Sequence, residues 1–189
     1  MLDLEPRLRF DPELLLLGQE VRLLLLDVDG VLTPGDLLVA AEGEQAKRFS
    51  TLDGHGLKLL AACGLRVAVI SGRDSPPLRW RLAELGLLEQ AVLGQSHKLP
   101  AAQAVLRDAG LDWSQVAALG DDWPDLPLLV RARLAACPPQ AHPEVLARVH
   151  HRTRAPAGLG AVREVCDLLL CARGAYAGLL AQAIAGEGT

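Results

Sequence analysis

Residues 21–34, VRLLLLDVDGVLTP, are the stretch of sequence that decides the fold. Four consecutive leucines end in two aspartates, Asp27 and Asp29, and in a glycine turn at Gly30. A run this short and this apolar predicts a buried strand rather than a separate helix. Side chains that follow a strand in an open α/β sheet lie where ligands bind. The stretch therefore predicts a strand with a functional site at its carboxyl end.

The rest of the chain alternates apolar runs with helical segments that are bounded by glycine or proline. This alternation predicts a doubly wound, Rossmann-like α/β fold, in which right-handed crossovers join parallel strands. The predicted strands span residues 21–26, 66–70, 91–93, 116–119 and 134–137, with an edge strand at 149–152. The predicted helices span residues 53–63, 76–86, 98–109, 126–133, 142–147 and 161–170. A β-hairpin is predicted with strands at residues 37–40 and 45–49 around a turn at 42–44.

The domain organisation follows from the segments outside this alternation. Residues 1–19 contain two prolines and mixed charge, and they predict an N-terminal arm with a short amphipathic helix that ends at Gly18. Residues 20–172 predict a single domain with no separate cap, carrying a small hairpin flap at about 36–50. Residues 173–189 are rich in alanine and glycine and predict a mobile tail.

Composition and charge exclude several classes of function. The 189 residues carry a net charge of −4, which argues against a protein that binds a polyanion such as DNA. Four cysteines without a C-x-x-C pair predict free thiols in a reducing cytosol. Charged residues and glycine interrupt the leucine runs near the N-terminus, so we predict neither a signal peptide nor a membrane span. We expect a cytoplasmic protein that binds neither nucleic acid nor membrane and acts on a small molecule.

Polar side chains follow four of the predicted strands. Asp27 and Asp29 follow the first strand, and Ser71 begins a Ser-Gly-Arg sequence after the second. Lys98 follows the third strand, and the sequence Gly-Asp-Asp-Trp-Pro-Asp at residues 120–125 follows the fourth. Because ligands bind where the carboxyl ends of parallel strands meet, we expect these groups to converge on one site.

The acidic groups predict a metal site. Asp27 and Asp121, with Asp125 as a third candidate, offer the hard oxygen ligands that Mg²⁺ prefers. Carboxylates gathered at one point repel each other unless a cation lies among them. We therefore predict Mg²⁺ as the cofactor.

The same groups meet the needs of phosphoryl transfer. A carboxylate such as Asp27 can attack phosphorus and form an aspartyl-phosphate. Lys98, Ser71 and backbone N–H groups can bind the phosphoryl oxygens, whose charge must be neutralised. Asp29 can protonate the leaving alkoxide and later activate water.

The sequence contains, in this order, D-x-D-G-V-L-T, S-G-R, a lysine and G-D-D-x-x-D. With these motifs it resembles the haloacid dehalogenase (HAD) superfamily of aspartyl-phosphate phosphatases. Within the superfamily, the lack of a cap insertion resembles the capless 3-deoxy-D-manno-octulosonate 8-phosphate phosphatases. So do the segments D-G-x-G at 53–56, G-Q-S-x-K at 94–98 and G-A-V-R-E-V-C-D-L-L at 160–169. The resemblance covers about residues 20–172 and implies a HAD-type fold and a role in lipopolysaccharide biosynthesis.

The resemblance implies roles for individual residues. Asp27 is the nucleophile and a metal ligand, Asp29 is the acid/base and binds the metal through its backbone carbonyl, and Asp121 is the other carboxylate ligand. The phosphoryl group is held by Ser71 and Lys98, which count with Asp27 and Asp29 as catalytic. The substrate contacts implied are Ser50, Asp53, Gly54, Lys58, Gly72, Arg73 and Arg81.

The family is a homotetramer in which segments of neighbouring subunits close the capless site, here residues 36–50 and about 156–175. The sequence departs from the family at Leu52 and Leu159, where the family carries arginines. Each loss removes a cation that could meet the carboxylate of a sugar acid. Two alternatives therefore stay open: a phosphatase of a nine-carbon sialic-type sugar phosphate, and a non-catalytic oligomerisation domain like those fused to sugar nucleotidyltransferases.

Overall fold

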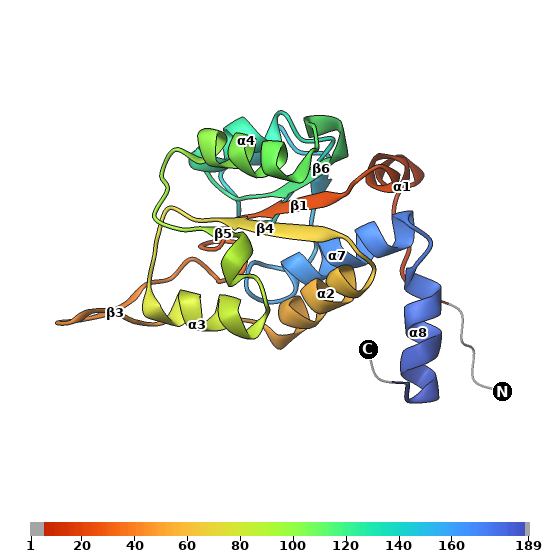
Figure 1. Cartoon of the computed structure of the whole chain (residues 1–189), viewed down its shortest axis with the longest axis horizontal. Coiled ribbons are helices and arrows are strands. Elements are labelled where there is room, and N and C mark those ends of the chain that lie inside the picture. Colours follow the sequence, from red (N-terminus) through yellow and green to blue (C-terminus); the bar gives the residue numbers. More distant parts are fainter. Residues whose placement is uncertain (1–5, 188–189) are drawn as a thin grey trace.

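A six-stranded parallel sheet forms the centre of the computed structural model, which describes residues 6–187. The strand order is β5-β4-β1-β6-β7-β8, so the leucine run lies in the middle of the sheet (Figure 1). This topology confirms the predicted doubly wound fold. The strands are β1 (Leu23–Leu26), β4 (Arg66–Ile70), β5 (Ala91–Val92), β6 (Val116–Leu119), β7 (Leu134–Cys137) and β8 (His151–Arg152).

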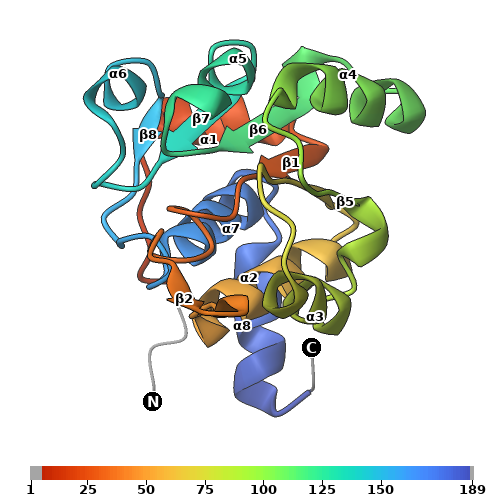
Figure 2. The ribbon, with the colours of Figure 1, turned by 90° about the vertical axis from the view of Figure 1, so that its left-hand side faces the viewer.

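The four leucines of β1 serve both faces of the sheet. Successive side chains of a strand point to opposite faces, so Leu24 and Leu26 join one apolar core, whereas Leu23 and Leu25 join the other. All four are almost fully buried. A helical layer must therefore cover each face of the sheet, and Figure 2 shows both layers.

The helices divide between these layers as the figure shows. On one face lie α2 (Thr51–Ala62), α3 (Pro76–Glu84) and α7 (Ala161–Ala172), and on the other lie α4 (Lys98–Ala109), α5 (Leu126–Leu129) and α6 (Pro143–Leu146). Two further helices are α1 (Pro12–Gln19) and α8 (Tyr176–Ala185), and three short 3-10 helices are η1 (Leu88–Gln90), η2 (Trp113–Gln115) and η3 (Trp123–Asp125).

The register of the central strands aligns their carboxyl ends. Leu26 of β1 lies beside Val69 of β4 on one side and Leu119 of β6 on the other. The next residue, Asp27, donates its backbone N–H to the Leu119 carbonyl at 3.1 Å. The residues that follow these three strands therefore emerge together at one edge of the sheet.

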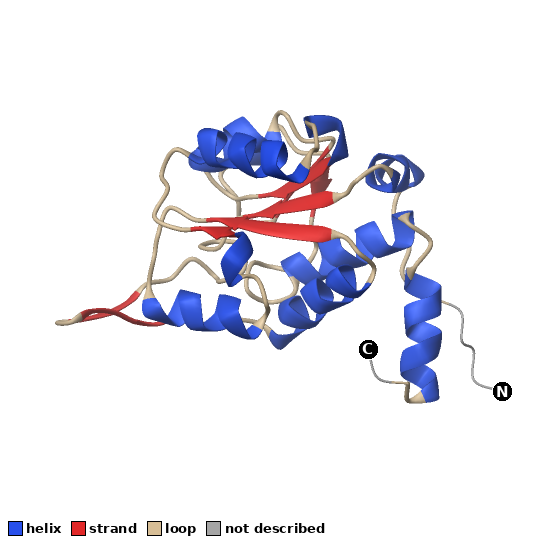
Figure 3. Cartoon of the chain, viewed as in Figure 1, coloured by secondary structure: helices blue, strands red, loops and turns tan. Residues whose placement is uncertain are grey.

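A two-stranded hairpin projects from the body of the molecule (Figure 3). Its strands are β2 (Leu38–Ala40) and β3 (Gly43–Ala46), so the predicted hairpin exists but the turn is at 41–42 rather than 42–44. Ala40 pairs directly with Gly43, and this pairing leaves only two residues for the turn. Residues 47–49, which we predicted as strand, lie outside β3.

Two other predicted segments differ in the structure. The helix predicted over residues 126–133 ends at Leu129, because the Arg133 N–H bonds to the Trp113 carbonyl and leads the chain into β7. The segment predicted as a tail contains helix α8, whose Tyr176 and Leu179 pack against the core. The N-terminal helix is present as α1, and residues 1–5 of the predicted arm lie outside the described residues.

No single helix within residues 6–187 is long and apolar enough to cross a membrane. Only α7 and α8 taken together pass that test, by length and composition, and they are bent by 108° where they meet.

Candidate active site

Three carboxylates meet at the carboxyl edge of the sheet. Asp27 follows β1, and Asp121 and Asp125 follow β6, the neighbouring strand. One oxygen of each lies within 4.8 Å of the others, a spacing that could hold a metal ion. The structure thus brings together Asp27 and Asp121, two of the predicted metal ligands, with Asp125, which the sequence offers as a further candidate.

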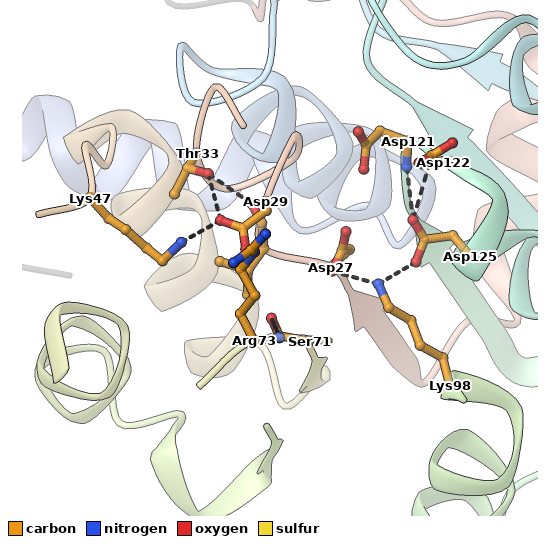
Figure 4. A network of polar contacts seen from close by, with 11 residues as sticks. Asp27, Asp29, Thr33, Lys47, Ser71, Arg73, Lys98, Asp121, Asp122 and Asp125 are labelled. Carbon is orange, nitrogen blue, oxygen red and sulfur yellow. Dashed lines mark hydrogen bonds and ion pairs between the residues drawn. The ribbon is translucent and has the colours of Figure 1, made fainter. Parts of the chain in front are cut away.

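Lys98 lies between two of these acids, as Figure 4 shows. It is the first residue of α4, and its Nζ is 2.6 Å from an oxygen of Asp27 and 2.6 Å from an oxygen of Asp125. The lysine is buried, so its charge is held by these two partners rather than by water. This position lets one cation serve both the nucleophile candidate and the acid beside it.

Both carboxylate oxygens of Asp125 accept hydrogen bonds from neighbouring groups. Its Oδ1 accepts a hydrogen bond from Lys98, and its Oδ2 accepts the backbone N–H groups of Asp121 and Asp122. Both oxygens are therefore already engaged. This geometry favours Asp27 and Asp121 as the metal-binding pair, with Asp125 orienting the lysine and the loop. The side chain of Asp29 lies outside the cluster, and a ligand role for its backbone carbonyl stays a prediction.

Burial and mutual repulsion perturb the acids. Burial, together with the charge of Asp125, raises the pKa of Asp27 to about 7 even though Lys98 opposes the shift. Burial and the charges of Asp27 and Asp125 raise the pKa of Asp121 to about 8. Burial alone would lower the pKa of Lys98, but its two acidic partners outweigh that effect and raise it. A bound cation would relieve this repulsion, so the donor set fits Mg²⁺.

These shifts predict how stability depends on pH. Because the pKa values of Asp27 and Asp121 are raised to about 7 and about 8, the folded chain holds more protons than the unfolded chain between about pH 4 and pH 8. The contribution of both groups is fully present below about pH 4 and is lost as pH rises through about 7 and 8. Without divalent metal, the free energy of unfolding is therefore expected to fall over this range.

Mg²⁺ should reverse the loss, because it replaces the missing protons. Thermal unfolding followed by circular dichroism, with EDTA or with Mg²⁺, should show a larger rise in Tm near pH 8 than near pH 6. At a free concentration of 100 times Kd, Mg²⁺ would add about 2.7 kcal/mol. An Asp121→Asn variant should lose most of the difference between the two pH values. An equal rise at both pH values would contradict the assignment.

Gly30 leaves room for one of the clustered acids. Its φ is +85°, and a Cβ placed on it would lie 2.0 Å from Oδ2 of Asp121. Any side chain here would collide with the carboxylate. The glycine of the D-x-D-G sequence is therefore required both by the backbone conformation and by the metal-site geometry.

Gly30→Ala is expected to displace Asp121 and weaken Mg²⁺ binding by about 10- to 100-fold. Backbone strain should also cost about 1–3 kcal/mol of stability. Gly64→Ala is a matched control, since Gly64 has φ +71° but faces open space. Calorimetric titration should show weaker Mg²⁺ binding for Gly30→Ala than for Gly64→Ala. Equal Mg²⁺ affinities would show that a side chain at position 30 does not disturb the metal site.

Ser71 and Arg73 provide donors beside the cluster. Ser71 follows β4 and is buried, and its Oγ accepts the backbone N–H of Arg73 at 3.1 Å. Its own hydroxyl proton is then available for an incoming oxygen. Gly72, between them, has no atom within 4 Å of the position of a Cβ, so the loop there is open to a ligand.

Asp29 is held by the predicted site residue Arg73 and by two groups that were not predicted, Lys47 and Thr33. Its Oδ1 accepts hydrogen bonds from Lys47 at 2.5 Å and from the Thr33 hydroxyl at 3.3 Å, and its Oδ2 is 3.7 Å from Nε of Arg73 (Figure 4). Thr33 lies four residues after Asp29 in the quoted stretch, but Lys47 lies beyond the hairpin. Only the fold of the hairpin brings Lys47 to this site, so no local sequence pattern could have identified it.

Several predicted substrate contacts have other partners in the structure. Asp53 is fully buried, and its carboxylate accepts the backbone N–H groups of Gly160 and Arg163 at the start of α7. Arg81 bonds to Glu84 and to the Ser50 carbonyl. These residues hold α2, α3 and α7 together.

Ser50 caps α2 through its side chain, and Gly54 is buried in that helix, where the position of a Cβ would lie 2.2 Å from the Arg81 guanidinium. Lys58 is exposed on the same helix. Among the predicted substrate contacts, therefore, the structure brings Gly72 and Arg73 beside the acids.

A cleft lies between the hairpin and the start of α3. Its volume is about 580 Å³, and its lining includes Glu44, Arg73 and Ser75. A larger cavity of about 980 Å³ lies between the end of α2, β5 and α4, and none of the predicted site residues line it. Arg73, which lines the smaller cleft, is also the residue whose Nε is 3.7 Å from Asp29.

Relatives with known names share most of the chain. A 3-deoxy-D-manno-octulosonate 8-phosphate phosphatase of Salmonella typhimurium is 38% identical over 163 residues, 86% of each chain. The corresponding phosphatase of Escherichia coli K12 is 40% identical over 157 residues, 83% of each chain. A crystal structure of the Moraxella catarrhalis phosphatase, in complex with magnesium, phosphate and KDO, has a TM-score of 0.86 at 34% identity and covers 90% of this chain and 97% of its own. No protein-family model matches the chain.

Proposed function

Because the chain belongs to the 3-deoxy-D-manno-octulosonate 8-phosphate phosphatase family of the HAD superfamily, we propose that it hydrolyses this eight-carbon sugar-acid phosphate with the help of Mg²⁺. It is a phosphoric monoester hydrolase. The observation that carries the proposal is the acid cluster at the end of β1, with Lys98 bound to Asp27, in a chain that matches these phosphatases over more than four-fifths of its length. The two alternatives, a nine-carbon substrate and a non-catalytic domain, are not favoured.

The reaction proceeds in two steps through Asp27. In the first step a carboxylate oxygen of Asp27 attacks phosphorus, the bond from phosphorus to the sugar oxygen breaks, and Asp29 gives its proton to that oxygen. In the second step water attacks phosphorus, the bond from phosphorus to the Asp27 oxygen breaks, Asp29 accepts a proton from the water, and inorganic phosphate leaves while Asp27 regains its carboxylate. Lys98 and the Ser71 hydroxyl hold phosphoryl oxygens in both steps.

Asp27 and Asp121 would hold Mg²⁺, and Asp29 would add its backbone carbonyl. When bound, the ion supplies positive charge that keeps Asp27 ionised and offsets charge on the phosphoryl group. Without such a cation the raised pKa of Asp27, about 7, would leave part of the nucleophile protonated at neutral pH. Lys98 supplies a second positive charge through its contacts with Asp27 and Asp125.

Phosphate release from a panel of sugar phosphates tests the substrate. The eight-carbon 3-deoxy-D-manno-octulosonate 8-phosphate should show the highest kcat/KM, and nine-carbon keto-acid phosphates should be poorer substrates. Leu52 and Leu159 are both more than half exposed, but their side chains are uncharged and do not supply the cations of the family arginines. A preference for the nine-carbon compounds would overturn the substrate assignment but leave the reaction class in place.

We also propose a cytoplasmic homotetramer, in which the hairpin and C-terminal segments close the sites of neighbouring subunits. Exposed apolar side chains on the hairpin support this, since Leu38 is 56% and Val39 67% exposed. All four cysteines lie within the described residues and are free, as a reducing cytosol would keep them. Light scattering should give four times the chain mass of 20.1 kDa, and Val39→Asp should lower it.

A further inference from the structure

Lys47 is a buried lysine on an exposed element. It directly follows β3 of the hairpin, where most side chains face solvent, yet its own side chain is only 1% exposed. A buried ammonium group is costly unless charged or polar partners surround it. Its partners should therefore reveal its role.

Two acids share the Lys47 ammonium group. Nζ is 2.5 Å from Oδ1 of Asp29 and 3.2 Å from Oε1 of Glu44. The same Glu44 oxygen accepts the hydroxyl of Ser75 at 2.8 Å, and Ser75 is the buried residue that precedes α3. The lysine is thus fixed from two sides, by the hairpin and by the start of α3, while its charged end reaches Asp29.

The two oxygens of Asp29 are treated differently. Oδ1 receives both Lys47 and the Thr33 hydroxyl, whereas Oδ2 has Nε of Arg73 at 3.7 Å. Two donors on one oxygen fix the rotation of the carboxyl group (Figure 4). A carboxyl group that carries its proton on Oδ2 can still accept a hydrogen bond at Oδ1. The contact with Lys47 is therefore compatible with both protonation states of an acid/base.

We propose that Lys47 is a positioning residue that binds Oδ1 of Asp29 and leaves Oδ2 as the oxygen that transfers the proton. This inference rests on the proposed phosphatase function and extends it to a residue outside the four strand ends. It also links the hairpin to catalysis, since any movement of the hairpin base would move Lys47 and with it the orientation of Asp29.

Lys47→Met in the Mg²⁺-loaded full chain tests the inference. With the sugar phosphate, kcat should fall by about 10²-fold while KM changes little, because orientation rather than binding is lost. With p-nitrophenyl phosphate the loss should be much smaller, since p-nitrophenolate leaves without needing a proton. Lys47→Arg, which keeps a cationic donor, should recover part of the rate. Arg107→Met, at an exposed cation outside the hairpin, is the control and should resemble the original chain.

Combination with Asp29→Asn shows whether Lys47 acts through Asp29. If it does, the double variant Lys47→Met/Asp29→Asn should be no slower than Asp29→Asn alone. Additive losses, equal losses with both substrates, or a rise in KM alone would overturn the inference. If Lys47→Met does not fold, Glu44→Gln loosens the same lysine and should show the same dependence on the leaving group. A chain that hydrolyses only other alkyl phosphates would refute the proposed substrate, but the Lys47 comparison could still be made with them.

Discussion

Asp27→Asn is expected to abolish phosphate release, with kcat reduced on the order of 10⁴-fold or more, because Asp27 is the proposed nucleophile of the reaction. The amide keeps an oxygen that can accept the Lys98 hydrogen bond, so the fold should survive. The raised pKa of Asp27 also means that its ionised form destabilises the metal-free chain. The variant should therefore unfold at a slightly higher temperature than the original chain near pH 8 in EDTA.

Steady-state phosphate release and thermal unfolding measure the two halves of this prediction. Asp108→Asn is a suitable control, since Asp108 is an exposed aspartate on α4, outside the hairpin. It should leave both activity and Tm unchanged. Normal hydrolysis of p-nitrophenyl phosphate by Asp27→Asn would show that another group attacks phosphorus.

Lys98→Met should have the second largest effect. The variant loses the cation that we propose holds the phosphoryl group, and this loss is expected to lower kcat/KM by about 10³-fold. It also leaves Asp27 and Asp125 buried without their shared partner, and breaking such a pair costs about 3–5 kcal/mol. The loss of stability should be smaller at low pH, where the two carboxylates can take up protons.

Arg107→Met provides the comparison for this variant, because Arg107 is an exposed residue on the same helix. Denaturant unfolding with and without Mg²⁺ should show that the ion recovers part of the stability. Steady-state phosphate release should show that it recovers little of the rate. If Lys98→Met kept normal activity, the ion pair with Asp27 would be only structural.

Much of the fold could be predicted because local patterns and tertiary demands agree. The leucine run has too few residues for a helix and no polar face, so only a central strand can bury it. Where local patterns failed, a distant contact decided the outcome. The end of α5 depends on the bond from Arg133 to Trp113, and α8 depends on packing of Tyr176 against the core.

The candidate site also contains residues whose positions the sequence pattern predicts and residues whose roles only tertiary contacts decide. The convergence of Asp27, Asp121 and Lys98 could be predicted because each lies in the connection after the carboxyl end of a parallel strand, or at the start of the helix that follows it. Asp53 shows the opposite case: a predicted substrate contact whose charge is used to bind the start of α7. The same sequence pattern can surround a buried carboxylate or an exposed one. The pattern therefore does not show whether the carboxylate is free to bind substrate.

The sequence by itself determined the reaction chemistry of this protein, because order along a strand–helix alternation is enough to bring the acids, the serine and the lysine to one edge. Only the tertiary structure decided which groups orient them. Lys47 reaches Asp29 across 18 residues, Asp125 turns both oxygens to partners, and Gly30 is held against Asp121. These contacts depend on the folding of a hairpin and two loops in three dimensions, and short-range periodicity carries no information about such distances.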